Sequence, residues 1–475
     1  MVFTSNLFLF LFLPVFLLVY YVVKDNWRSH VIVLGSYAFY AWWRPDFLLL
    51  FVGISYWNYW FGLLIKRRLD ADDKQGAFRL LTLGVIGDLA TLGYFKYANF
   101  GVEVFNEILA PLGVNTFTLE HIILPLGISF YVFQAISYIV DIYRKDAEPT
   151  RRFVDFAAFI ALFPQLIAGP ILRYSLIDQQ LKQRTHSMEL FSLGACRFML
   201  GFVKKVLIAD SLAPMGTVIL GDAEPQMLDA WFGMFICLVQ LYFDFSGYSD
   251  MAIGLGMMMG FRFAENFNQP LLCQSMTEFW RRWHLTLADF LRDYIYMPLI
   301  RSKRMGADAA LFCTMLLSGF WHGASFAYIV FGLYFAVLML IERRMKWVTK
   351  VNGPYRFWRN VLAVALVVCV MPFFATGDIQ HALNIITGML GLRGLGSLDG
   401  YFLATSQMTV AFTAVALLWL ALAGRINVRY YTGIKQGYWM QHVGGLSMVL
   451  LWAAFGLSLT RLAANSFSPF LYFQF

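Results

Sequence analysis

Charged residues are scarce in this chain of 475 residues, where Asp, Glu, Lys and Arg make up only 14%, against roughly 25% in ordinary soluble domains. Hydrophobic residues make up 59%, and Phe alone occurs 47 times. This composition excludes a soluble globular enzyme, a disordered chain and a nucleic-acid-binding module. The net charge of +8 needs no nucleic acid as a partner, because membrane proteins retain Lys and Arg on their cytoplasmic side.

Long polar linkers and paired cysteines are also missing. No polar stretch is long enough to separate two folds, so we expect one membrane-embedded domain over residues 1–475. The five cysteines form no CxxC pair, which favours small buried thiols over a disulfide framework or a zinc site. None of the seven histidines shows a metal-ligand spacing such as HExxH, so we expect no metal site.

Apolar runs recur along the whole chain. A spanning helix needs about 20 apolar residues, and the uncharged run 2–23 meets that length. It lacks a basic start and a small-residue cleavage site, which indicates a retained helix rather than a signal peptide. Further runs lie near 30–43, 46–65, 78–95, 122–140, 228–245, 248–261, 309–320, 324–341, 357–375, 407–423 and 443–460. The sequence predicts an all-α polytopic membrane protein with about ten to twelve spans.

Basic clusters orient these spans. Lys24 and Arg28 follow the first run, residues 66–68 are Lys-Arg-Arg after the third, and Arg144 and Lys145 follow the fifth. An outward N-terminus places all three clusters in the cytoplasm, in agreement with the positive-inside rule. We therefore expect a periplasmic N-terminus in a bacterial inner membrane.

Two stretches do not read as regular spans. Residues 101–120 are less apolar and predict a loop with a surface helix. Residues 153–172 are apolar but contain Pro164 and the pair Gly169-Pro170. Because proline breaks helices, and broken backbone at membrane depth must be buried or line a cavity, this stretch predicts a re-entrant or kinked segment. Residues 174–190 are polar and are expected on the cytoplasmic side.

Residues 264–304 are too polar to span and too aromatic for a plain loop. Ser275 and Glu278 have capping-box spacing, which predicts one helix from there to about Tyr294. Glu278 and Arg282 are four residues apart, as in a helical charge pair. Trp280, His284, Leu287 and Leu291 would share one face of that helix. An amphipathic helix lying on the bilayer surface is the simpler interpretation, although such a helix could also roof a site.

His322 is the strongest candidate for chemistry. It lies between two apolar runs, next to Trp321, and Gly319 and Gly323 around it let a helix or ligand come close. A polar ring at membrane depth is expensive and indicates a site, and an imidazole can take a proton from a hydroxyl at neutral pH. A histidine that only joins helices through a hydrogen bond explains the local sequence equally well.

A third group of polar residues runs from Tyr242 to Asp250. It places Asp244 and Asp250 in or beside an apolar helix, and Asp88 is a further intramembrane carboxylate. Buried charges need partners, and the candidates are Arg262, Arg281 and Arg282. Broken helices and intramembrane Asp residues also occur in secondary transporters and flippases, which form the rival class. An inert scaffold of a secretion complex is a third possibility.

These residues together resemble the membrane-bound O-acyltransferase family, and within it the alginate O-acetyltransferase branch. The resemblance covers nearly the full length, and its motifs lie at residues 40–44, 94–97, 124–130, 137–141, 163–170, 242–250, 265–270, 279–284, 321–323 and 468–475. One departure is the stretch 297–304, which lacks a Gly-rich loop expected in alginate members. That departure leaves cellulose open as the acetylated polymer.

The resemblance implies many helices around a central funnel or tunnel. It also implies acetyl transfer from a cytoplasmic donor, expected to be acetyl-CoA with no bound cofactor, toward periplasmic or membrane-anchored partner subunits that acetylate an exopolysaccharide, alginate first. The family's invariant histidine matches His322, and a second functional position matches His284.

The expected mechanism needs a base and support for an oxyanion. His322 would be the base, and His284 or a backbone N–H near Gly323 would stabilise developing charge. Supporting or tunnel-lining residues are expected at Asp244, Ser246, Tyr248, Asn266, Asn268, Gln269, Glu278, Trp280, Arg282, Trp283, Trp321 and Gly323. Candidates for the phosphates of the donor are Arg281, Arg301, Lys303 and Arg304, although a solvated charge run is the commoner explanation of such residues.

Overall fold

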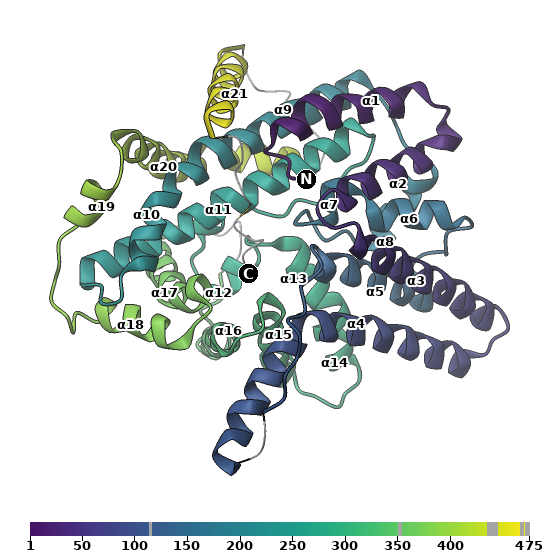
Figure 1. Cartoon of the computed structure of the whole chain (residues 1–475), viewed down its shortest axis with the longest axis horizontal. Helices are drawn as coiled ribbons and strands as arrows, with labels where there is room; N and C mark the ends of the chain where they lie inside the picture. Colours follow the sequence, from purple (N-terminus) through teal and green to yellow (C-terminus); the bar gives the residue numbers. More distant parts are fainter. Residues whose placement is uncertain (114–115, 350–353, 435–444, 466–469, 471–475) are drawn as a thin grey trace. The chain divides into compact units, whose positions relative to one another are not determined.

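The computed structural model describes residues 1–113, 116–349, 354–434, 445–465 and 470. They form helices, with no β-strand in these ranges (Figure 1). Six of the helices are long and apolar enough to cross a membrane, namely Asp46–Asp70, Lys74–Leu112, Met227–Met258, Phe326–Arg344, Phe357–Thr376 and Gly445–Ala464. Phe8–Val22 and Gln407–Leu420 are shorter apolar helices. The all-α polytopic fold is confirmed, and the count of ten to twelve spans stays a prediction.

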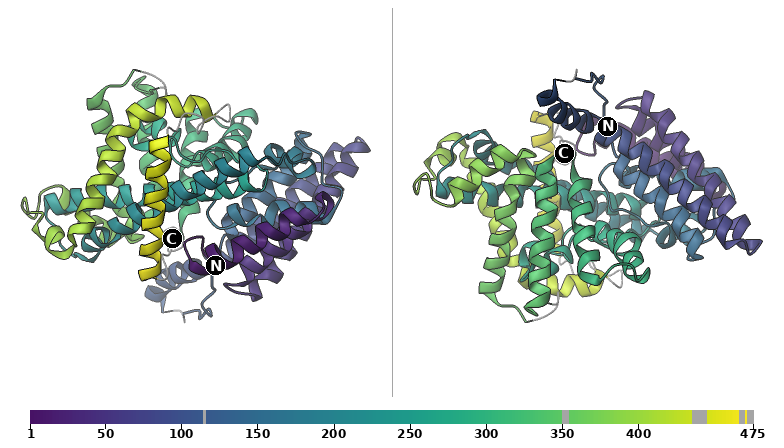
Figure 2. Two further views of the ribbon diagram at one scale, coloured as in Figure 1. Left: turned by 90° about the horizontal axis from the view of Figure 1, so that it is seen from above. Right: turned by 90° about the horizontal axis from the view of Figure 1, so that it is seen from below.

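The chain divides into two compact units, the first made of Met1–Phe191 and Leu255–Phe263. Its helices are η1 (Phe8–Phe12), α1 (Leu13–Val22), α2 (Asp25–Ala41), α3 (Asp46–Asp70), α4 (Lys74–Leu109), η2 (Ala110–Leu112), α5 (Ile128–Arg144), α6 (Phe153–Ala161), α7 (Phe163–Leu166) and α8 (Tyr174–Lys182). Helices α3, α4 and α5 pack against one another, and α3 and α4 run side by side in both views of Figure 2.

The second unit comprises Ser192–Gly254 and Ala264–Phe475. Its helices are α9 (Met188–Val203), η3 (Lys204–Ala209), α10 (Asp210–Gly221), α11 (Met227–Met258), η4 (Pro270–Leu272), α12 (Met276–Trp280), α13 (Leu285–Leu291), η5 (Arg292–Tyr296), α14 (Met297–Arg301), α15 (Ala307–His322), α16 (Phe326–Arg344), α17 (Phe357–Thr376), α18 (Ile379–Met389), α19 (Asp399–Ala404), α20 (Gln407–Ile434) and α21 (Gly445–Asn465). The ends of α9 and α11 belong to the first unit.

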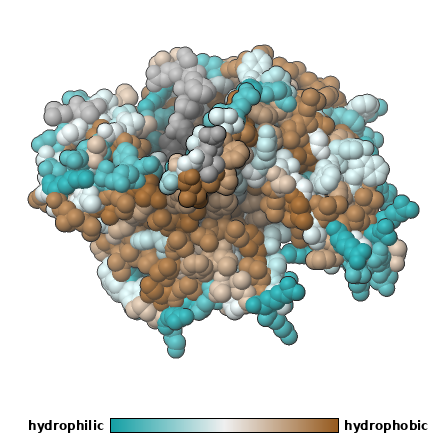
Figure 3. Space-filling model, turned by 60° about the horizontal axis from the view of Figure 1, so that its bottom comes forward, coloured by the Kyte–Doolittle hydropathy of each residue, from teal (hydrophilic) through white to brown (hydrophobic). Residues whose placement is uncertain are grey.

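Apolar side chains cover much of the face shown in Figure 3, and hydrophilic residues gather at its edges. Leu49, Leu446 and Phe357 are examples of large apolar side chains that are more than two-thirds exposed. In water such a surface would cause aggregation, whereas in a bilayer it faces lipid. The surface therefore agrees with the multi-pass membrane character inferred from composition.

Three parts of the predicted helix pattern were wrong. The stretch 101–120, expected as a loop with a surface helix, begins as a continuation of helix α4 to Leu109, because it contains no proline before Pro111. The runs 228–245 and 248–261 form the single helix α11, since the polar residues between them are buried against neighbours instead of ending the helix. Helices α9 and α10, which the prediction did not include, occupy 188–203 and 210–221.

The broken segment was predicted correctly. Helix α6 ends at Ala161, the short α7 starts at Phe163, and every residue from Phe156 to Leu172 is buried. Its buried backbone follows the rule that irregular chain at membrane depth must be covered by protein. Inside the first unit, Gln165 helps to cover it by donating from Nε2 to the carbonyl of Phe159 at 2.6 Å.

Candidate active site

His322 is the last residue of α15, which packs against α16. The two helices approach closely at a pair of glycines: a Cβ on Gly332 would lie 2.6 Å from the carbonyl oxygen of Met315 and 3.1 Å from the Cα of Gly319. Small residues at a helix crossing let the backbones come together in this way. The α15–α16 contact therefore determines where the imidazole at the end of α15 lies.

The His322 ring lies among aromatic side chains and is 6% exposed. Its centroid is 5.0 Å from that of Trp321, 5.3 Å from Phe374 and 5.7 Å from Phe331, all at edge-on angles. These apolar walls lower the local dielectric, so that charge forming during a reaction would interact strongly with the ring. The imidazole of His322 therefore lies in apolar surroundings inside the second unit.

His284 lies at a break between two short helices. The single helix predicted from Ser275 to Tyr294 was wrong, because α12 ends at Trp280 and α13 starts at Leu285. His284 is the N-cap of α13 with φ 44° and ψ 54°, in the left-handed region. A residue other than glycine held there costs about 1–3 kcal/mol and is found disproportionately at functional sites.

The surface-helix interpretation of this segment was also wrong. Trp280, His284, Leu287 and Leu291 are all buried, and His284 is 0% exposed. Its ring centroid lies 4.8 Å from Phe245 of α11 and 6.1 Å from Trp321. The segment thus brings His284 into the interior of the second unit, where Trp321 contacts both imidazoles.

Asn266 holds His284 by its side chain. Its Oδ1 lies 2.9 Å from Nδ1 of His284 and accepts a hydrogen bond from the Thr286 hydroxyl at 2.9 Å. Its backbone carbonyl accepts from the N–H of Leu285 at 2.9 Å. Burial first, and then the charge of His322, lower the pKa of His284 well below its ordinary value. The lowered pKa favours the neutral form of the His284 imidazole.

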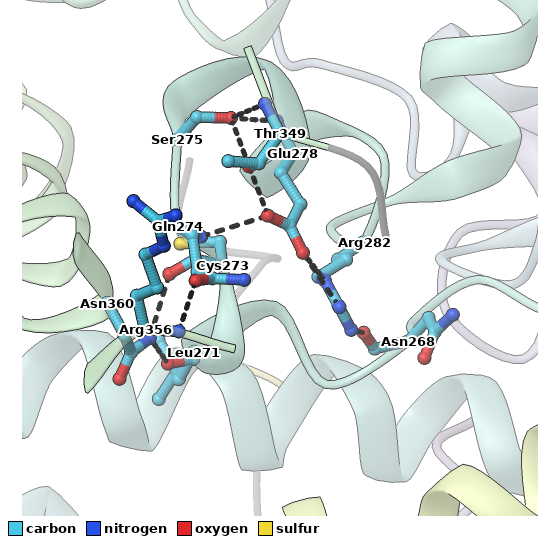
Figure 4. Close-up of polar contacts among 10 residues, drawn as sticks. All are labelled: Asn268, Leu271, Cys273, Gln274, Ser275, Glu278, Arg282, Thr349, Arg356 and Asn360. Atoms are coloured by element: carbon cyan, nitrogen blue, oxygen red, sulfur yellow. Dashed lines mark hydrogen bonds and ion pairs between the residues drawn. The ribbon is translucent and has the colours of Figure 1, made fainter. Parts of the chain in front are cut away.

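A network around α12 holds this segment in place (Figure 4). Ser275 caps the helix, as predicted, by accepting from the N–H of Glu278 at 3.1 Å. The buried Glu278 carboxylate pairs with Arg282 at 2.8 Å, also as predicted, and accepts from the N–H of Gln274 at 3.1 Å. Arg282 in turn donates to the carbonyl of Asn268 at 3.1 Å. Glu278 and Arg282 thus brace the loop that carries Asn266.

The second unit also contains a buried charge cluster. Lys205 lies between Asp244 at 2.5 Å and Asp210 at 2.7 Å. Arg197 and Lys204 pair with Asp250 at 2.5 and 2.7 Å. A further contact joins Arg197 to Glu265 at 2.7 Å.

The predicted partners of these carboxylates were wrong. Arg262 and Arg281 are exposed and Arg282 pairs with Glu278. The π-helical turn Lys204–Ala209 instead presents two consecutive lysines to α11. The sequence signal that could have found them is a Lys-Lys pair inside an apolar run.

We expect Lys205→Met to lower the free energy of unfolding of the protein in nanodiscs by about 3 kcal/mol or more, because removing one partner leaves the other charge buried. Differential scanning fluorimetry detects this loss as a lower unfolding temperature. The double variant Lys205→Met/Asp244→Leu, which removes both charges, should recover most of it. Equal losses in the single and double variants would show that the pair is not coupled.

Comparison with known proteins shows the family of this chain. Residues 149–376 match the membrane-bound O-acyltransferase family. A protein named "Probable alginate O-acetylase AlgI" from Pseudomonas putida is 45% identical over 501 residues, which cover 100% of both chains. The chain belongs to the membrane-bound O-acyltransferase family.

Its AlgI-like branch is supported by a second relative of the same name, from Pseudomonas aeruginosa, at 43% identity over 100% of both chains. A more distant relative is the "Peptidoglycan O-acetyltransferase" of Helicobacter pylori, at 33% identity over 83% of this chain and 81% of the relative. This membrane-bound O-acyltransferase is therefore an enzyme that transfers acyl groups.

The remaining predicted site residues of this acyltransferase fall into two groups. Buried in the second unit with the two histidines are Ser246, Tyr248, Gln269, Trp280, Trp283, Trp321 and Gly323. Exposed to the outside are Arg281, Arg301, Lys303 and Arg304. Asp88 lies in the first unit, where Asn58 donates to it at 2.7 Å. The structure thus buries these residues in the unit that holds both imidazoles, where Trp321 contacts both rings, and leaves the four cations exposed.

Proposed function

We propose that this protein transfers acetyl groups from acetyl-CoA on the cytoplasmic side of the bacterial inner membrane to an acceptor used for O-acetylation of an exopolysaccharide. His322 is the general base. It removes the proton of the acceptor hydroxyl, the oxygen attacks the thioester carbonyl, the C–S bond breaks, and the proton returns to the leaving thiolate. The observation that carries the proposal is the pair of buried imidazoles around Trp321.

Alginate is the polymer that we propose first, because relatives that match this chain over its full length are named as alginate O-acetylases. Cellulose remains the alternative polymer because of the departure at 297–304. Partner subunits in the membrane or periplasm would receive the acetyl group. Neighbouring reading frames in the genome would discriminate the two polymers.

The two ends of α15 support a donor that enters from the cytoplasm. The end opposite His322 is basic: Arg301, Lys303 and Arg304 precede it, and Arg343 of α16 reaches Asp308 there at 2.8 Å. Fifteen residue steps separate Ala307 from His322, about 22 Å at 1.5 Å per residue. The long pantetheine arm of coenzyme A suits such a separation between phosphate and thioester.

The orientation follows from the same charges. The positive-inside rule places this basic end in the cytoplasm, together with Arg67 and Arg68 at the end of α3. The N-terminus is then periplasmic. Proteoliposomes of known orientation test the donor side. Labelled acetyl-CoA should support transfer only when it is added on the side that holds Arg301, Lys303 and Arg304. Transfer only when acetyl-CoA is added on the other side would contradict the proposal.

We expect the triple change Arg301→Gln, Lys303→Gln and Arg304→Gln to raise KM for acetyl-CoA by about tenfold while kcat changes little, since uniform binding affects KM. Added salt should raise the wild-type KM in the same direction. Steady-state kinetics of labelled acetyl transfer measure both.

The matched control changes Arg67, Arg68 and Lys74 to Gln. These three exposed cations belong to the first unit and carry the same total charge. An equal rise of KM in the control would show a general surface effect, and the donor-phosphate assignment would then be wrong.

The rival transporter class makes a different prediction. It would depend most on Asp88, Asp244 or Asp250, yet Asp244 and Asp250 are each paired with cations. Acetyl transfer that survives in Asp88→Asn but not in His322→Ala supports the acyltransferase mechanism. The reverse pattern would support the rival class.

A further inference from the structure

The side chain of Asn266 is buried and makes contacts in several directions. Its Nδ2 donates to Ser249 Oγ of α11 at 3.0 Å, and its Oδ1 faces Nδ1 of His284 and the hydroxyl of Thr286. The oxygen and the nitrogen of an amide are similar in size, so a fixed donor is needed to assign them.

The backbone N–H of Thr286 provides that donor. It points to Oδ1 of Asn266 at 3.4 Å, and a backbone N–H can only donate. The atom that faces it must therefore be the amide oxygen. The same oxygen lies 2.9 Å from Nδ1 of His284. Because an amide oxygen only accepts, Nδ1 must carry the hydrogen.

A neutral imidazole has one N–H, so the other nitrogen of His284 then carries a lone pair. Nε2 of His284 is buried and has no hydrogen-bond partner among the residues that the structure describes. A buried acceptor without a partner is costly, so Nε2 is available to accept a hydrogen bond from a group that enters the site. The left-handed backbone of His284, held by the Leu285 N–H on Asn266, keeps the ring in this orientation.

We propose that Asn266 is a positioning residue that fixes His284 in the Nδ1–H tautomer, so that Nε2 accepts a hydrogen bond from an O–H or N–H group of the bound substrate. His284 is then an acceptor in the resting enzyme and does not stabilise the oxyanion. Support for the oxyanion must come from another donor. The proposal deepens the proposed function and rests on it for the identity of the substrate, but the tautomer itself does not depend on it.

Nitrogen NMR tests the tautomer directly. We would label the protein with ¹⁵N-histidine in nanodiscs and identify His284 by comparison with His284→Asn. A protonated Nδ1 and an unprotonated Nε2 are expected for wild type. The opposite pattern, or a protonated ring at neutral pH, would overturn the proposal without any need for a variant of Asn266 to fold.

The pH dependence of acetyl transfer tests the positioning role. Activity needs neutral His284, so the rate falls when pH drops below the pKa of His284, which burial holds low. In Asn266→Asp a carboxylate would face Nδ1–H and stabilise the imidazolium, which raises that pKa. We expect the acidic limb of the pH–rate profile to move to higher pH by about one unit or more. Above that limb the rate of acetyl transfer should be close to that of wild type.

The carboxylates next to Asn266 and Ser249 in the sequence are already paired with a cation, so they do not stabilise a charge on His284. Glu265 beside Asn266, and Asp250 beside Ser249, are both paired with Arg197. His322 at the end of α15 is the titratable residue whose charge acts on His284.

Ser249→Ala is the matched control, because it removes the hydrogen bond of the Asn266 amide nitrogen and leaves the amide oxygen that faces His284 unchanged. The acidic limb of the pH–rate profile of this variant should stay where it is in wild type. If the role of Asn266 is purely structural, Asn266→Asp should lose the same fraction of acetyl transfer at every pH and its acidic limb should not shift. That result would overturn the proposal. If His322→Ala keeps full activity, the proposed function fails, while the NMR result still decides the tautomer.

Discussion

Replacing His322 with alanine is expected to lower acetyl transfer by at least about 100-fold, the typical lower range for loss of a general base. The hydroxyl would then have to attack before its proton is taken up, in surroundings of Phe331, Phe374 and Trp321 that stabilise little charge. Single-turnover transfer of labelled acetyl from acetyl-CoA measures the chemical step.

The control is the folded state of the variant. The His322 ring packs edge-on against aromatic neighbours, so its loss leaves a small space and α15 should remain in place. Size-exclusion profiles and thermal unfolding should stay close to wild type. Transfer within about threefold of wild type in this folded variant would show that His322 is not the base, and a scaffold role would then become the better explanation.

Changing Gly332 to valine is expected to have the second largest effect. The new Cβ would lie 2.6 Å from the Met315 carbonyl oxygen and 3.1 Å from the Cα of Gly319, so that α15 and α16 must separate. Overpacking of this kind costs about 1–3 kcal/mol or more, and here it also displaces the end of α15. We expect a lower unfolding temperature and at least about tenfold lower acyl transfer, measured on the same nanodisc preparation.

Gly456→Val provides the matched control for this change. Gly456 lies inside a helix of the same unit, α21, and a Cβ there would meet no atom within 4 Å. The same added volume should leave stability and transfer close to wild type. If the two valine variants behave alike, close packing of α15 on α16 does not position His322.

Two local features, a helix cap and a helix break, were predicted correctly from the sequence. Ser275 and Glu278 have capping spacing, and the structure shows the cap. Pro164 predicted a break, and α6 does end at Ala161. Both features depend on residues a few positions apart, where a side chain meets its own backbone or where proline removes a backbone donor.

The break at His284 could not be predicted in this way. Residues 275–294 have helical spacing, yet the chain turns through a left-handed residue at 284. The bonds that hold this turn come from Asn266, which is 18 positions earlier in the chain. Tertiary contacts of this kind override local helix propensity, and nothing in the spacing within 275–294 indicates them.

The class of this protein could be inferred from its sequence, because a chain so poor in charge and so rich in apolar runs is stable only in lipid. Its motifs also indicated the acyltransferase family and the two candidate histidines. The pairings between side chains became known from the folded chain: Lys205 neutralises Asp244, Gly332 lets α16 approach α15, and Asn266 holds His284. These contacts join residues distant in sequence, and their energies depend on burial and orientation, which composition and spacing do not specify.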